Sequence, residues 1–119
     1  MSKSEVMLMK EDKRLAHLIE SLRASKKGVW KRIAHFLGRS KRQRVAVNLS
    51  KISKVAKEGE VIVVPGKVLG DGSAPKAKIA AYSFSDMARK KLMKEGAEIL
   101  EIEKLYSSNK EGKGIRIVI

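Results

Sequence analysis

The residues of this chain that could bind a charged partner are concentrated in one stretch. Residues 26–44 contain eight basic side chains and no acidic one: Lys26, Lys27, Lys31, Arg32, Arg39, Lys41, Arg42 and Arg44. Like charges at this density repel one another and destabilise the isolated protein, with no internal compensation. The pattern therefore indicates a segment that binds a polyanion rather than an ordinary solvated surface.

The side chains that most often carry out catalysis or bind metals are scarce and scattered. The chain has no cysteine, so it has neither thiolate ligands nor disulfides, and His17 and His35 each lack a second ligand at a metal-like spacing. The glycines of residues 66–72 match neither the phosphate-binding loop nor the dinucleotide fingerprint. Three glutamates near the C-terminus are interpreted as solvating charge on a helix: Glu98, Glu101 and Glu103. We expect no active site and no cofactor.

Composition limits the class of protein further. The chain has 119 residues, 27 basic and 13 acidic side chains, a net charge of +14 and 43% apolar residues, which is enough for the core of one domain. Its longest apolar runs are four residues, too short for a membrane span or a signal peptide. Aromatic residues make up only 4%, which disfavours base stacking as the main mode of binding. We expect an intracellular protein that contacts the phosphate backbone of a folded nucleic acid.

Helical spacing dominates the first half of the chain. Asp12 is a plausible cap for a helix whose apolar positions are Leu15, Leu18, Ile19 and Leu22. A second helix is predicted from residue 29 to Gly38, with Lys31 and Arg32 on its outer face, and residues 39–44 follow as a polar loop. A third short helix is predicted between residues 48 and 59, with its lysines outward: Lys51, Lys54 and Lys57.

The second half alternates between strand and helix patterns. A β-branched strand is predicted at 61–64, broken by Pro65 and Gly66, with a short return strand at 67–69 and a flexible turn at 70–75. Further elements are expected in this order: a strand at 79–84, a helix capped by Ser85 and ended by Gly96, a strand at 98–100, a short helix at 102–106 and a strand at 115–119. Strands interleaved with helices indicate an α/β fold.

Five segments, in order, resemble successive blocks of one family, that of large-subunit ribosomal protein eighteen of archaea and eukaryotes (the e series): 12–22, 40–52, 63–70, 80–88 and 112–117. That family is related to the C-terminal part of bacterial large-subunit protein fifteen. The resemblance implies one compact α/β domain over 12–119, in which a helical N-terminal part precedes irregular β-β-α layers, with 1–11 as a flexible arm. The resemblance is to the archaeal members of the family, since the chain ends at Ile119 without the basic tail of the eukaryotic members.

The same resemblance implies a structural role on large-subunit ribosomal RNA, in the cytoplasmic ribosome beside neighbouring ribosomal proteins, with no catalysis, small-molecule substrate or membrane. The expected RNA-binding face consists of Lys26, Lys27, Lys31, Arg32, Arg39, Lys41, Arg42, Arg44, Asn48, Lys51, Lys54 and Lys67. For Asn48, capping of the third helix is an equal alternative. The family's proline is missing after Asn109, which predicts a looser turn there.

Other classes of function stay open at this point. A free-standing basic module on DNA or mixed RNA would show the same charge pattern. An RNA-modifying enzyme or its subunit, or a basic membrane-surface protein, is a weaker alternative. No predicted helix combines a broad apolar face with interfacial Trp or Phe, which argues against the membrane. Trp30 could stack on a base, but its place in an apolar helix favours the core.

Overall fold

The computed structural model describes residues 12–119, so the predicted arm at 1–11 lies outside the described residues. The elements are, in chain order, α2 (Lys13–Arg23), α3 (Gly28–Leu37), the 3₁₀ turn η1 (Lys41–Gln43), β1 (Val45–Asn48), α4 (Leu49–Val55), β2 (Val61–Leu69), β3 (Lys78–Phe84), α5 (Asp86–Lys94), β4 (Glu98–Glu101), α6 (Ile102–Ser108) and β5 (Ile115–Ile117). The predicted α/β class is confirmed.

The predicted caps of α2 and α5 are confirmed in detail. The Asp12 carboxylate accepts a hydrogen bond from the Leu15 amide at 3.1 Å, and the Ser85 hydroxyl accepts one from the Ala88 amide at 3.1 Å. Each satisfies an amide in the first turn that has no partner within its own helix. These caps fix where α2 and α5 begin.

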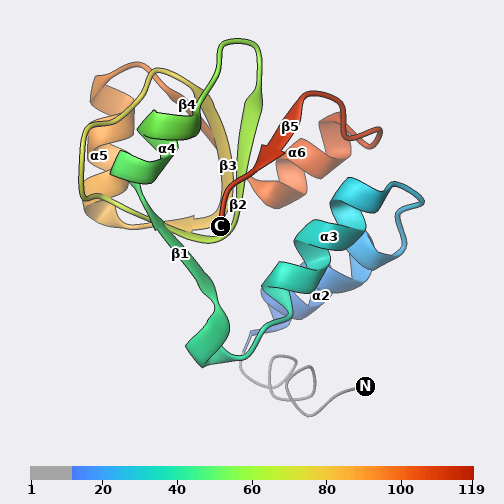
Figure 1. The fold of residues 1–119 in the computed structure, drawn as a ribbon. Coiled ribbons are helices and arrows are strands. Elements are labelled where there is room, and N and C mark those ends of the chain that lie inside the picture. The colour runs from blue at the N-terminus through green and yellow to red at the C-terminus, as the bar shows by residue number, and fades with distance from the viewer. Residues whose placement is uncertain (1–11) are drawn as a thin grey trace.

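All strand pairings are parallel, and β2 is the central strand. β3 lies along one edge of β2 and β4 lies beyond β3. Along the other edge, β5 pairs with Val61–Val63 and β1 with Gly66–Leu69, so these two strands follow each other on the same side (Figure 1). The order is therefore β1 and β5, then β2, β3 and β4.

Helices cover both faces of the sheet, and the side chains of β2 alternate between two cores. Val63 packs with α2, α3 and α6, whereas Ile62 and Val64 pack with α4 and α5. Figure 1 shows the two groups of helices on opposite sides of the strands. A sheet buried on both faces requires strands that are continuously apolar, which explains the β-branched run in β2.

The predicted break at Pro65 and Gly66 is wrong, because β2 runs through both residues and no strand returns. A register shift between Val64 and Lys67 accommodates the proline, which has no amide hydrogen to donate. Gly66 is needed for close approach, since a Cβ built there would lie 2.0 Å from the Val45 carbonyl oxygen. The pair is therefore an irregularity within one strand.

Three other expectations need correction. Residues 45–48 form strand β1, which the sequence analysis did not predict, and α4 ends at Val55 instead of reaching Gly59. The turn at 70–75 is fixed rather than flexible, because the Lys91 ammonium donates to the carbonyls of Gly70 and Gly72 at 2.7 and 3.0 Å. No helix within residues 12–119 has the length and apolar character needed to cross a membrane.

Candidate nucleic-acid interface

Helix α3 positions the basic stretch, which we call the α3 strip: the basic residues of 26–44. A ten-residue helix is about 15 Å long, and Lys26 and Lys27 precede it while the basic residues of 39–44 follow it. Lys31 and Arg32 are exposed on its outer face, as predicted. The strip therefore extends along the whole of α3 and past both of its ends.

Trp30 holds the inner face of α3 in the core, as the sequence favoured. Its ring is fully buried, and its Nε1 donates to the carbonyls of Asn109 and Lys110 at 3.2 and 3.1 Å. The ring meets Tyr106 edge-on at 5.0 Å between centroids. A buried indole whose donor is satisfied cannot stack on a base.

The turn that receives Trp30 is closed by the side chain of Asn109, so the expectation of a looser turn is wrong. The Asn109 amide group donates to the Lys113 carbonyl at 2.9 Å, and its oxygen accepts from the amides of Gly112 and Lys113 at 3.1 and 3.2 Å. Hydrogen bonds from one side chain thus replace the rigidity that a proline would supply.

Half of the strip is exposed and forms no ion pair with any residue in the described part of the chain: Lys26, Lys31, Arg32 and Arg42. Lys27 is different, because its ammonium lies 3.0 Å from the Glu111 carboxylate. The hydrogen bond and charge of Lys27 hold the pKa of Glu111 below its ordinary value. Lys41 begins η1.

Two arginines of the strip contact the protein itself. The Arg39 guanidinium lies over the Phe36 ring at 4.6 Å, within the range of a cation–π contact. The Nε of Arg44 is buried and has no hydrogen-bond partner among the described residues. Neither side chain is therefore a purely solvated charge.

A second group of expected residues lies where the sheet is uncovered, at the ends of β1 and β2. Val47 packs on the α4 and α5 side, so the alternation of a strand directs Ala46 and Asn48 to the opposite face. Lys67 is exposed and in register with Ala46. Asn48 occupies the N-cap position of α4 but makes no capping bond with its side chain, so the capping alternative is wrong.

The structure separates Lys51 and Lys54 from the α3 strip. Both are exposed on α4, which covers the opposite side of the sheet from α2 and α3 (Figure 1). The Lys51 ammonium also donates to the Ile119 carbonyl. The twelve residues expected on one face are thus divided between two sides of the molecule.

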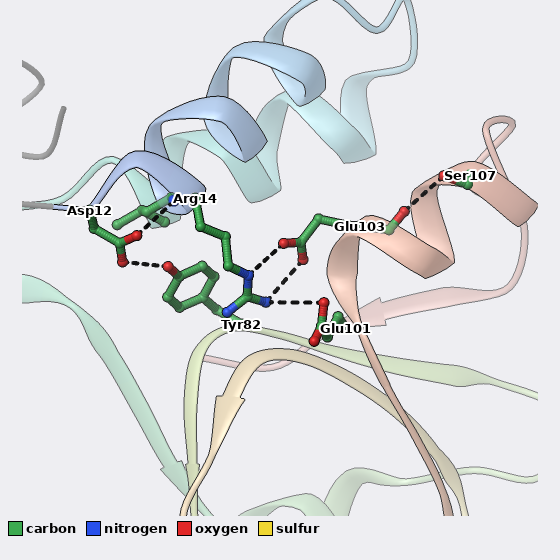
Figure 2. A network of polar contacts seen from close by, with 7 residues as sticks. Asp12, Arg14, Tyr82, Glu101, Glu103 and Ser107 are labelled. Carbon is green, nitrogen blue, oxygen red and sulfur yellow. Dashed lines mark hydrogen bonds and ion pairs between the residues drawn. The ribbon is translucent and has the colours of Figure 1, made fainter.

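A separate polar network, which we call the Arg14 junction, joins α2, β3, β4 and α6 (Figure 2). The Arg14 guanidinium donates to both carboxylate oxygens of Glu103, at 2.7 and 3.1 Å, and lies 3.6 Å from Glu101. It also lies 4.2 Å above the ring of Tyr82, whose hydroxyl donates to Asp12. The junction consists of these five residues.

Electrostatics within the junction favour the charged forms of Asp12 and Arg14. Burial alone would raise the pKa of Asp12, but hydrogen bonds from the Tyr82 hydroxyl and the Leu15 amide, with the charge of Arg14, hold that pKa below its ordinary value. The hydrogen bond to Glu103 raises the pKa of Arg14. Burial and the bond to Asp12 raise the pKa of Tyr82 to about 12.

The junction corrects the interpretation of the C-terminal glutamates as solvating helix charge. Glu98 and Glu101 lie in β4, and Glu103 in α6 binds Arg14. Arg14 cannot be recognised as a junction residue from the sequence, because its partners lie 87 and 89 positions away and no local spacing links them. Within residues 12–119, no group of His, Asp or Glu could hold a metal ion.

Comparison with known proteins identifies the family. Residues 3–118 match the family model described as "Ribosomal protein 60S L18 and 50S L18e". The chain is 46% identical over 92 residues to "Large ribosomal subunit protein eL18" of Archaeoglobus fulgidus, covering 76% of this chain and 79% of the relative. It is 43% identical over 103 residues to the eL18 of Pyrobaculum aerophilum, covering 86% and 84%, and 40% identical over 116 residues to that of Methanothermobacter thermautotrophicus, covering 93% and 96%.

These matches confirm the resemblance drawn from the five sequence blocks. The relatives are named as components of the large ribosomal subunit, in agreement with a structural role and not with an enzyme. The chain belongs to the L18/L18e family of ribosomal proteins.

Proposed function

We propose that this chain is a structural protein of the large ribosomal subunit, in which residues 12–119 act as one domain that binds large-subunit ribosomal RNA through the α3 strip. One observation carries the proposal: Lys26, Lys31, Arg32 and Arg42 are exposed, and none pairs with a carboxylate in the described chain. Cations without internal partners are compensated when phosphates lie against them.

The expected mechanism is contact with the RNA backbone. Each phosphate that a lysine or arginine neutralises releases counterions, so affinity falls as salt rises. Arg32 and Arg42 can each bind a phosphate with two parallel hydrogen bonds, whereas Lys26 and Lys31 act as point charges. Such contacts position the protein on a fold of the RNA and carry little sequence information.

The expected residues that lie on the same side of the sheet as α3 extend this surface. Arg39 and Arg44 lie beyond the end of α3, and Asn48 and Lys67 lie on the uncovered end of the sheet. An amide side chain among cations can bond to base edges and to 2′-hydroxyls, and the 2′-hydroxyl is the group that distinguishes RNA from DNA. We assign to Asn48 this discriminating contact, and to neighbouring ribosomal proteins the surfaces that the RNA leaves free.

The test replaces the four unpaired cations with glutamine, which keeps helix propensity and removes charge. In the K26Q/K31Q/R32Q/R42Q variant, the slope of log affinity against log salt for large-subunit rRNA should become shallower by about 3, since each lost phosphate contact removes about 0.7–0.9. The thermal transition should stay unchanged. A control that removes four charges elsewhere, K13Q/K57Q/K76Q/K104Q, should keep most of the slope.

Two results would overturn the proposal. Wild-type protein that prefers duplex DNA to folded rRNA in competition would favour a free-standing DNA-binding module. Equal slopes for the strip variant and its control would show that the α3 strip is not the interface. Sedimentation offers an independent check, because a component of the particle should remain with large subunits through a high-salt gradient.

A further inference from the structure

A second cationic surface covers the side of the sheet opposite the α3 strip. Helices α4 and α5 pack on that side, and we call their exposed basic side chains the α4/α5 surface: Lys51, Lys54, Arg89, Lys90 and Lys94. Of these five, the sequence predicts only Lys51 and Lys54 as RNA-binding residues. Residues 89, 90 and 94 alternate with the buried Ala88 and Leu92, and that spacing is the signal that could have revealed them.

The loop between β2 and β3 holds the two helices in a fixed relation. A Cβ at Gly72 would lie 2.6 Å from the Ser50 amide in α4, and one at Gly70 would lie 2.6 Å from the Met87 side chain in α5. The Ser50 amide also donates to the carbonyl of Asp71 at 3.0 Å. Because the loop is packed and bonded between both helices, their cations are displayed on a rigid surface.

The charge of this surface is not neutralised within the described chain. No basic residue of α4 or α5 forms an ion pair with a carboxylate side chain of the described residues. Lys90 and Lys94 are one helical turn apart, where like charges repel. Asp86 and Glu95 are the acidic residues at the ends of α5, and they leave the surface with net positive charge.

Two of these five cations also contact other parts of the protein. Lys51 donates to the Ile119 carbonyl, and the Arg89 guanidinium lies 5.8 Å from the centre of the Phe84 ring. Lys54, Lys90 and Lys94 make no hydrogen bond or ion pair with any described residue. These three side chains are therefore the ones that can be replaced without disturbing the fold.

We propose that the α4/α5 surface binds the phosphate backbone of a second RNA segment, so that the protein bridges two segments of the large-subunit rRNA. The inference rests on the proposed function of the α3 strip. Helices α3 and α4/α5 lie in layers on opposite faces of the sheet, each about 10 Å from it (Figure 1). The exposed cations of these layers therefore lie on opposite sides of the molecule. One RNA helix lying on the α3 strip cannot reach both.

The experiment is backbone footprinting of isolated large-subunit rRNA with three variants and the wild type. K54Q/K90Q/K94Q removes the second surface, K26Q/K31Q/R32Q/R42Q removes the first, and K13Q/K76Q/K104Q is a control that removes three charges from separate elements. We expect wild type to protect two separate RNA segments. The α4/α5 variant should lose one of them, keep the other and lose about 2–3 units of salt slope.

The outcomes separate the two proposals. If K54Q/K90Q/K94Q keeps every protection that the control keeps, the bridging proposal is wrong, and the surface is available to an acidic protein partner instead. If the α3-strip variant keeps all protections while the α4/α5 variant loses them, the function assigned to the strip fails and the second surface is the main interface. Loss of the same segment by both variants would overturn bridging.

Discussion

The Arg14 junction and the α3 strip use the same residue types for opposite purposes. In the junction, Arg14 meets two carboxylates and an aromatic face from three other elements. In the strip, Arg32 and its unpaired neighbours meet no carboxylate of the described chain. Glutamates thus lie beside Arg14, which joins several elements of the fold, and no described carboxylate pairs with the four cations of the strip that are proposed to bind RNA.

A structural arginine can thus be distinguished from one that binds a partner. Charge and exposure do not separate the two, because the Arg14 side chain is itself 40% exposed. The presence of acceptors from distant elements separates them. The comparison predicts that changes in the junction alter stability without altering RNA binding, and that changes in the strip do the reverse.

The largest expected loss of stability comes from the anchor of the strip rather than from its charges. Trp30→Ala should lower the free energy of unfolding by about 3–5 kcal/mol, because a fully buried ring leaves a cavity. Denaturant unfolding measures this loss, and Trp30→Phe is a milder control that keeps most of the volume. A loss below about 1 kcal/mol for the alanine variant would mean that α3 is not fixed by its inner face.

Breaking the junction should have an intermediate effect. Arg14→Gln removes the bonds to Glu103 and Glu101, and we expect a loss of about 1–2 kcal/mol, since charged hydrogen bonds at partly exposed positions contribute modestly. The salt slope of rRNA binding should change by no more than the loss of one phosphate contact would cause, about 0.7–0.9. Unchanged unfolding with a large drop in affinity would place Arg14 with the strip and remove the distinction.

The hydrogen bond between Tyr82 and Asp12 can be removed by a more conservative substitution. Tyr82→Phe keeps the ring beneath Arg14 and removes the hydroxyl that donates to Asp12. We expect a loss of about 1 kcal/mol, measured as a lower midpoint in urea with an unchanged slope. No shift in that midpoint would contradict a structural role for the hydroxyl.

The pH dependence of stability should reflect the shifted pKa values of Asp12 and Tyr82. The folded pKa of Asp12 is lowered, so its contribution is present above its unfolded pKa of about 4 and is lost as the pH falls through the lower folded value. The folded pKa of Tyr82 is raised to about 12, so its contribution is present below pH 10 and is lost as the pH rises towards 12. The difference between wild type and Asp12→Asn should therefore be constant near neutrality and shrink in acid.

The smallest expected effect on stability comes from the strip itself. Arg32→Gln should change the free energy of unfolding by less than about 0.5 kcal/mol, as at other exposed sites. The same variant should reduce the salt slope of rRNA binding by about 0.7–0.9. A marked loss of stability would show that Arg32 has a structural task like that of Arg14.

Local rules predicted much of the fold. The apolar spacing of α2, the caps at Asp12 and Ser85, and the inward place of Trp30 depend on neighbours within one turn of helix, and they are readable from the sequence. The basic residues on the outer face of α3 follow from the same spacing. The residues that determine such features are close together in the sequence.

Features that depend on distant segments could not be predicted in this way. β1 is a strand because it pairs with β2, and Pro65 stays in β2 because a register shift absorbs it. The division of the expected RNA-binding residues between two sides arises because β1 carries the chain across the sheet between α3 and α4. The partners of Arg14 come from the opposite end of the sequence.

The parallel pairing of β5 with β2 has a consequence for synthesis. Val61 pairs with Ile115, so the central strand gains this neighbour only when translation has passed residue 115. Contacts between segments so far apart form late, because a long loop must close first. In a nascent chain paused before residue 115, the edge of β2 at Val61–Val63 would therefore have no partner strand, and protection from proteolysis should rise in one step when β5 emerges.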